Sequence, residues 1–235
     1  MQTHRIVSRD EWIVARKHHL AQEKEFTRLR DRLSAERRDL PWVRVDKDYV
    51  FEGPNGKQHL DQLFGGKSQL IVQHFMFGPD WDAGCKSCSF WADNYNGIIV
   101  HLMQRDIAFV VVSSAPFERI EAFRKRMGWS FEWVSSSGND FNHDYHVSFT
   151  PEEIAAGEID YNYVPRTTSI TELPGISVFY RDAAGTVFHT YSCYSRGLDA
   201  MNAAYQYLDL APMGRNEADL PFSMAWVRHH DKYAD

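Results

Sequence analysis

The spacing of hydrophobic and polar positions changes several times along the chain, and the first block has the period of a helix. Apolar positions recur every three or four residues from residue 9 to about Asp39, opposite a heavily charged face. Ser8 and Glu11 have the spacing of a capping box at its start, and Leu40-Pro41 ends it. We therefore predict an N-terminal helical extension over residues 1–40, with a stripe of Trp12, Ala15, His19, Gln22, Phe26, Leu29 and Leu33.

This stripe has two interpretations. Two of its seven positions are polar, which fits a helix that packs on the core and keeps its charged face in solvent. A long helix with a partial apolar stripe can also pair with a copy of itself. A homodimer through the N-terminal helix is therefore one hypothesis about partners.

Nearly continuous apolar runs follow, and they predict strands that are buried on both faces. Residues 69–77 read QLIVQHFMF and residues 107–113 read IAFVVVS, and 131–135 form a third run. Helices are expected between them, at about 85–104 and from Pro116 to Met127. A hairpin around Pro54-Asn55-Gly56 and a short helix at 60–64 precede these elements. The β-α-β-α-β order predicts a parallel sheet with right-handed crossovers.

The remainder of the chain adds a polar insertion and an antiparallel pair. Residues 138–171 are polar and rich in aromatic side chains, with one helix expected after Thr150-Pro151. Residues 176–181 and 186–192 predict two antiparallel strands, and a closing helix is expected at 198–210. The predicted organisation is a domain over 41–211, with an insertion at about 138–171, and a tail over 212–235.

Composition narrows the class of protein. The chain has 235 residues, 43% of them hydrophobic and 25% charged, which is ordinary for a globular domain. A net charge of −6 without a dense basic run argues against nucleic-acid binding. No apolar run approaches the roughly 20 residues that cross a bilayer, and the N-terminus lacks the pattern of a secretory signal. The expected compartment is the cytoplasm, where thiols stay reduced.

The segment FMFGPDWDAGCKSC carries the candidate chemistry. It places Cys85 and Cys88 three positions apart, where a buried strand and a loop give way to a helix. Amides in the first turn of a helix stabilise a thiolate, and Lys86 adds positive charge. We predict that Cys85 is the nucleophile and that Cys88 resolves the mixed disulfide. Asp80 and Asp82 would raise the pKa of a nearby thiol or relay a proton.

The order of elements resembles the thioredoxin fold, an α/β fold with a central mixed sheet. The resemblance implies a cis proline before the fourth strand, facing the cysteines, and Pro174 is the candidate. Backbone beside Pro174, at Leu173, would then hold the substrate in extended form. Trp81 is a third candidate for substrate binding. It lies four residues before Cys85, whereas thioredoxins carry a tryptophan directly before their first cysteine.

The whole chain also resembles a bacterial family of unknown function that is predicted to contain dithiol–disulfide oxidoreductases of thioredoxin-like architecture. The segments that carry this resemblance are LPWVRVDKDYVFEGPNGKQHLDQLF, QLIVQHFMFGPDWDAGCKSCSFWAD, VVVSSAPFERIEAFRKRMGW and WVRHHDKY. The resemblance implies that Cys85 and Cys88 are redox cysteines, acting on a protein or small-molecule disulfide. We expect no cofactor and no bound metal.

Metal binding is one alternative. Cys85, Cys88, His189 and Cys193 supply zinc-binding atoms, but His189 and Cys193 fall on one predicted strand, about 13 Å apart. His143 and His146 have a spacing that would bind a metal only on a helix.

Two functional alternatives stay open beside disulfide exchange. The opening from Tyr49 to Phe77 resembles that of peroxiredoxins, but Ala83 stands where their motif places a hydroxyl before the cysteine. In a non-catalytic binding module, the 138–171 insertion would contact a partner. Cys193 is either a buried thiol or a third redox cysteine.

Overall fold

The computed structural model describes residues 4–234, and the chain divides into two units, residues 1–41 and 42–235. The first unit contains α1 (Arg9–Arg38), the predicted long helix. Ser8 and Glu11 form the predicted capping box, in which the Ser8 hydroxyl accepts from the Glu11 amide and the Glu11 side chain accepts from the Ser8 amide. None of the residues of α1 is buried.

A mixed sheet forms the centre of the second unit, and the strands of the described residues run in the order β1-β10-β9-β4-β5-β6-β2-β3. The neighbours β4, β5 and β6 pair in parallel, and β9 joins β4 in antiparallel register. This arrangement is the predicted thioredoxin-like fold. The strands are β1 (Val43–Arg44), β2 (Val50–Gly53), β3 (Gly56–His59), β4 (Gln69–His74), β5 (Ile107–Ser113), β6 (Glu132–Ser135), β9 (Gly175–Arg181) and β10 (Val187–Tyr194).

The apolar runs fold as strands that are buried on both faces. Leu70 and Val72 of β4 enter one core cluster, whereas Ile71 packs against the cluster on the opposite face. The second cluster holds Phe109 and Val111 of β5, while the alternate residues of that strand face the first. Burying each such side chain contributes about 1.5–3 kcal/mol.

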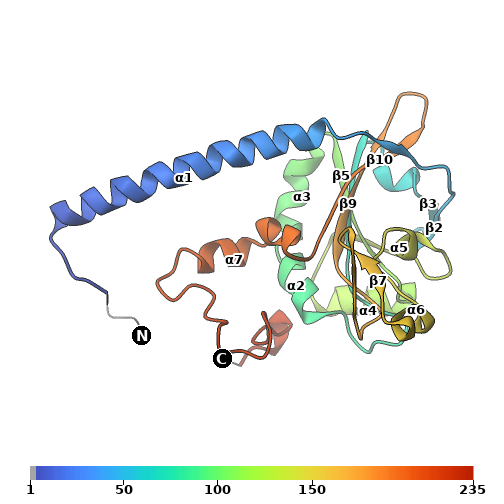
Figure 1. Cartoon of the computed structure of the whole chain (residues 1–235). Coiled ribbons are helices and arrows are strands. Elements are labelled where there is room, and N and C mark those ends of the chain that lie inside the picture. Colours follow the sequence, from blue (N-terminus) through green and yellow to red (C-terminus); the bar gives the residue numbers. More distant parts are fainter. Residues whose placement is uncertain (1–3, 235) are drawn as a thin grey trace. The chain divides into compact units, whose positions relative to one another are not determined.

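Helices from three segments cover the face that holds the cysteines. These are α2 (Lys86–Ala92), α3 (Tyr95–Met103) and α4 (Phe117–Arg126), and their apolar side chains enter the second cluster. Figure 1 shows α2 and α3 on one side of the sheet and α5 (Phe141–Asp144) on the other. The opposite face is also covered by the short 3₁₀ helix η1 (Gln62–Phe64).

The single helix predicted over residues 85–104 is wrong, because the chain breaks between α2 and α3. The break lies at Asp93 and Asn94. The Asp93 carboxylate accepts from Trp129 Nε1 at 2.9 Å and lies 2.6 Å from His230 Nδ1. The Asn94 amide bonds back to carbonyls of the preceding turn, which competes with helix continuation.

The insertion has structure and a small core of its own. It contains α5, α6 (Pro151–Ala156) and a hairpin of β7 (Ile159–Tyr161) and β8 (Val164–Arg166). The predicted capping box of α6 forms between Thr150 and Glu153. The insertion core consists of Val147, Phe149, Ile159, Tyr161 and Tyr194.

The closing helix is divided as well. A 3₁₀ helix, η2 (Ser195–Met201), precedes α7 (Ala203–Leu208), and Asn202 caps α7 by accepting from the Tyr205 amide. A last 3₁₀ turn, η3 (His230–Lys232), lies in the tail. Across residues 4–234, no helix is both long enough and apolar enough to cross a membrane.

Candidate functional site

The two nearby cysteines lie where the loop after β4 enters α2. Cys85 is the N-cap residue of α2, and its amide donates to the Met76 carbonyl at 2.9 Å. Gly84 allows this close approach, since a Cβ there would lie 2.7 Å from a Phe75 ring atom and 2.9 Å from a Phe123 ring atom. Cys85 is half-buried, Cys88 is 4% exposed, and no disulfide joins them.

The environment of Cys85 favours its thiolate. A hydrogen bond with the Cys88 thiol, the amides of Cys88 and Ser87 and the Ser87 hydroxyl together lower the pKa of Cys85 to about 6, against the opposing effect of burial. Lys86 is directed elsewhere, because its Nζ donates to the Ala225 carbonyl at 3.3 Å. The anion at Cys85 is therefore stabilised by hydrogen bonds from its own helix turn.

The environment of Cys88 has the opposite effect. The hydrogen bond to Cys85 raises the pKa of the Cys88 thiol, and burial and the negative charges of Cys85 and Glu172 raise it further. The two thiols are thus unequal. One is set to be an anion near neutral pH and the other to keep its proton.

Glu172 is a buried carboxyl that the sequence analysis did not single out. It is 3% exposed, and it accepts hydrogen bonds from Ser114 Oγ at 2.6 Å and Ser148 Oγ at 2.8 Å. Burial outweighs these bonds and raises the pKa of Glu172 to about 7. Asp80 and Asp82, the carboxylates that the sequence did suggest, are exposed. The only sequence signal for Glu172 was its place two residues before Pro174.

Replacing Glu172 with glutamine is expected to change how stability depends on pH. The folded-state pKa of about 7 lies above the ordinary value of 4.5. Between these values the unfolded chain loses a proton that the folded chain keeps, so this carboxyl's contribution to stability is lost as pH rises. In this range the free energy of unfolding falls by up to about 1.4 kcal/mol per pH unit. Denaturant unfolding at pH 5 and at pH 7.5 should show that the free energy of unfolding falls less between these pH values for Glu172→Gln than for the wild type.

The exposed Glu158 of the insertion provides the control. Glu158→Gln should follow the wild type at both pH values. Equal pH dependence in all three proteins would contradict the raised pKa of Glu172.

The predicted substrate-binding residues do not all gather at one place. Pro174 and Cys88 line the same pocket, whereas Leu173 packs on the insertion core and Trp81 packs on the core beneath α2. The peptide bond between Leu173 and Pro174 is trans, so the predicted cis bond is wrong. Trans is the ordinary isomer, and the Leu173 amide is held by the Val147 carbonyl at 2.8 Å.

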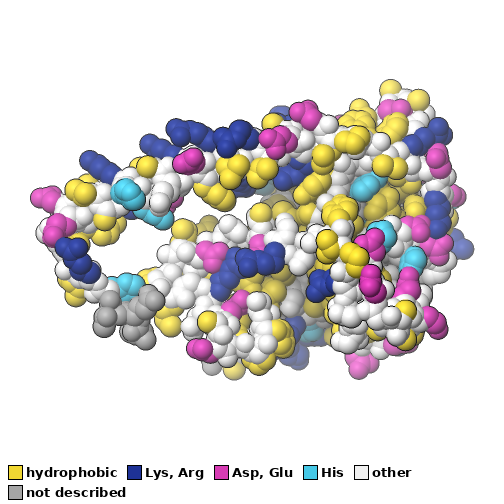
Figure 2. Space-filling model, in the orientation of Figure 1, with side chains coloured by type: hydrophobic (Ala, Val, Ile, Leu, Met, Phe, Trp, Pro, Cys, Tyr) yellow, Lys and Arg dark blue, Asp and Glu magenta, His cyan; other side chains and the backbone are white. Residues whose placement is uncertain are grey.

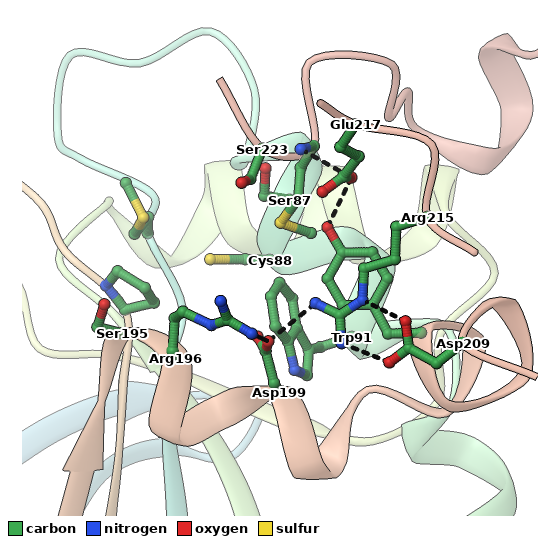
Figure 3. A pocket seen from close by; sticks show the side chains of 14 residues that line it. Ser87, Cys88, Trp91, Ser195, Arg196, Asp199, Asp209, Arg215, Glu217 and Ser223 are labelled. Atoms are coloured by element: carbon green, nitrogen blue, oxygen red, sulfur yellow. Dashed lines mark hydrogen bonds and ion pairs between the residues drawn. The ribbon is translucent and has the colours of Figure 1, made fainter. Parts of the chain in front are cut away.

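The pocket beside Cys88 has a volume of about 490 Å³. Cys88 and Trp91 of α2 line it, together with Met76 and with residues of η2 and of the tail (Figure 3). The tail residues that line it include Glu217 and Met224. The sequence did not predict that the tail forms part of this wall.

The tail is fixed at several points around the start of α2. His229 Nε2 lies 2.8 Å from the Gly84 carbonyl, and Arg126 bonds to both carboxylate oxygens of Asp231 at 2.9 Å. Trp226 stacks edge-on with Phe90 of α2, with ring centroids 5.5 Å apart. The tail therefore has several anchors on this part of the structure.

The histidines and cysteines considered as metal ligands lie in other settings. His143 Nε2 lies 2.9 Å from Glu153 Oε1, and His189 Nε2 lies 2.8 Å from Ser192 Oγ. Cys193 is buried with Ile176 and Leu198. Within residues 4–234, no group of three or more His, Cys, Asp and Glu side chains is arranged to hold a metal ion.

Comparison with solved structures finds similarity to peroxiredoxin Q of Xanthomonas campestris (TM-score 0.47, 13% identity, covering 72% of this chain and 98% of that one). Peroxidoxin BcpB of Mycobacterium tuberculosis is also similar (TM-score 0.47, 11% identity, 72% and 97%). So is a Chlorobium tepidum protein provisionally named thiol:disulfide interchange protein DsbE (TM-score 0.41, 14% identity, 71% and 94%).

A search of curated protein sequences gives no significant match. One family model matches residues 1–233, and its description is "Bacterial protein of unknown function (DUF899)". The match covers nearly the whole chain, including the cysteine segment, the insertion and the tail. The chain therefore belongs to the DUF899 family of bacterial proteins.

Proposed function

We propose that the protein is a thiol–disulfide oxidoreductase in which Cys85 attacks a substrate disulfide and Cys88 resolves the product. The observation that carries this proposal is the inequality of the two thiols, with the pKa of Cys85 lowered to about 6 and that of Cys88 raised. A thiolate is the attacking species in disulfide exchange, and its partner should stay protonated until it is needed.

The first step converts the thiolate into a mixed disulfide. Cys85 attacks one sulfur of a disulfide RS–SR′, a bond forms between Cys85 and SR, and R′S⁻ leaves and takes a proton from solvent. This step removes the negative charge and the hydrogen bond at Cys85 that raise the pKa of Cys88. Formation of the mixed disulfide therefore prepares the second thiol for ionisation.

In the second step Cys88 loses its proton and attacks the Cys85 sulfur, which releases RS⁻. Two electrons have then moved to the substrate, and a Cys85–Cys88 disulfide remains for a dithiol reductant to reduce. The Cys88 proton passes to solvent, and the charge of Glu172 is one of the effects that hold this proton on Cys88 beforehand.

Thiol counting tests the redox pair directly. The chain contains three cysteines, and mild oxidation should lower the number of thiols that can be alkylated in denaturant by two. Peptide mapping should find the new disulfide between Cys85 and Cys88. Retention of all three thiols would support the binding module, and oxidation of Cys85 alone by peroxide would support peroxide reduction instead.

We also propose that two copies pair in parallel through α1. The stripe repeats every seven residues, with Trp12, His19, Phe26 and Leu33 at one core position and Ala15, Gln22 and Leu29 at the other. Phe26 is 66% exposed, and Figure 2 shows hydrophobic side chains along one edge of α1 and basic ones along another. In a parallel pair, the flanking positions would place Glu11 opposite Arg16, His18 opposite Glu23 and Glu25 opposite Arg30.

Light scattering of the full chain tests this pairing. We expect a dimer for the wild type and for Val14→Glu, and a shift to monomer for Phe26→Glu. Val14 is a matched control, since it is 70% exposed on the same helix but lies outside the stripe. A monomeric wild type, or equal behaviour of the two variants, would contradict the pairing.

A further inference from the structure

Five charged side chains line the Cys88 pocket, and three of them are bonded to one another. Arg215 bonds to both oxygens of Asp209 at 2.8 Å and to Asp199 at 2.9 Å. Its guanidinium also lies 3.7 Å from the centre of the Tyr205 ring. Because these side chains bond to one another, we assign Arg215, Asp199 and Asp209 a structural role in the wall of the pocket.

Arg196 keeps most of its hydrogen-bonding capacity. Its side chain is 85% exposed, and within the described residues it makes one ion pair, with Asp199 Oδ2 at 3.2 Å. That same oxygen already accepts from Arg215 at 2.9 Å. The planar guanidinium of Arg196 is therefore available for a carboxylate, which is the group that its geometry suits.

Glu217 has the opposite charge and also keeps one oxygen available. Its Oε1 accepts from Tyr205 Oη at 2.8 Å, Trp226 Nε1 at 2.7 Å and the Met224 amide at 3.0 Å. In the described part of the chain these bonds all go to Oε1 and leave Oε2 available. Figure 3 shows Glu217 and Arg196 on either side of the Cys88 side chain.

We infer that the pocket binds a low-molecular-weight disulfide of the amino-acid type, which carries both a carboxylate and an ammonium group. Arg196 binds the carboxylate, Glu217 binds the ammonium group, and the disulfide lies toward Cys88, the redox cysteine that lines the pocket. A volume of about 490 Å³ is in the range of small-molecule sites. This inference rests on the proposed function, and the electron balance is the one given above.

Single-turnover reduction of four small disulfides tests the inference. Cystine carries both charged groups, N,N′-diacetylcystine only the carboxylate, cystine dimethyl ester only the ammonium group, and 2-hydroxyethyl disulfide neither. Each second-order rate constant is divided by that of the same disulfide with free dithiothreitol, which removes differences in intrinsic reactivity. We expect cystine to exceed each singly charged compound by about tenfold, as charge-assisted hydrogen bonds of this kind provide.

Arg196→Gln should lower the normalised rates of cystine and diacetylcystine by about tenfold and leave the other two unchanged. Arg105→Gln removes the same charge from an exposed position outside the pocket and should change none of the four. Equal normalised rates for all four compounds would overturn the inference, as would reduction of protein disulfides alone, and either result would leave the proposed function intact. Failure with every disulfide, proteins included, would instead overturn the proposed function.

Discussion

Replacing Cys85 with serine is expected to lower the rate of disulfide reduction by a factor on the order of 10³ or more, because the attacking thiolate is lost. A serine hydroxyl at the same N-cap position would accept the same amide hydrogen bonds. It would not ionise near neutral pH and does not exchange with disulfides. The measurement is single-turnover reduction of a small disulfide, with folding checked by thermal unfolding.

Replacing Cys88 with serine should have a different effect. The first step proceeds, so one equivalent of R′SH is released, but the mixed disulfide at Cys85 persists. Intact-protein mass spectrometry should detect the adduct on Cys88→Ser and not on Cys85→Ser. Cys193→Ser is the control for both, since Cys193 lies in a separate buried cluster. If the Cys85→Ser protein formed an adduct on Cys88 as fast as the wild type reacts with the disulfide, the roles of the two cysteines would be the reverse of those assigned here.

The parts of the site that depend on local sequence could be predicted. The strand, the loop and the start of a helix at Cys85 are specified by neighbouring residues, through an apolar run, a Gly-Pro stop and a helix-compatible segment. The capping boxes at Ser8 and Thr150 are local in the same way. Their partners lie three residues apart, so the pattern alone is sufficient.

The parts of the site that depend on distant contacts could not be predicted. The break at Asp93 is stabilised by Trp129 and by His230, which lie 36 and 137 residues away in sequence. Glu172 is buried because Ser114 and Ser148 supply its hydrogen bonds, 58 and 24 residues away. No periodic pattern in the sequence indicates that residues so far apart contact each other in the fold.

The pocket escaped prediction for the same reason. Its charged lining comes from η2, from the end of α7 and from the tail, and no apolar pattern in these segments points to α2. The tail is brought there by single contacts such as His229 with the Gly84 carbonyl. Arg196 and Glu217 have their proposed roles only because these segments meet beside Cys88.

The second large effect concerns the ionisation of Cys85. A thiol with an ordinary pKa near 8.5 is under 1% ionised at pH 6, whereas one with a pKa of about 6 is half ionised. Alkylation of Cys85 by iodoacetamide at pH 6 should therefore be roughly tenfold faster than alkylation of an unperturbed thiol of equal accessibility, because the lower nucleophilicity of a low-pKa thiolate offsets part of the gain in ionisation. The hydrogen bond with Cys88 is the largest cause of the lowered pKa, so Cys88→Ala should move it upward, while Cys193→Ala should leave it unchanged.

The presence of a thiolate at Cys85 is best examined through the pH dependence of its alkylation, followed by peptide mass spectrometry in the reduced wild-type protein. We expect a midpoint near pH 6 for Cys85, with Cys88 unreactive throughout that range. A midpoint near the ordinary value of about 8.5, or reaction at Cys88 before Cys85, would contradict it.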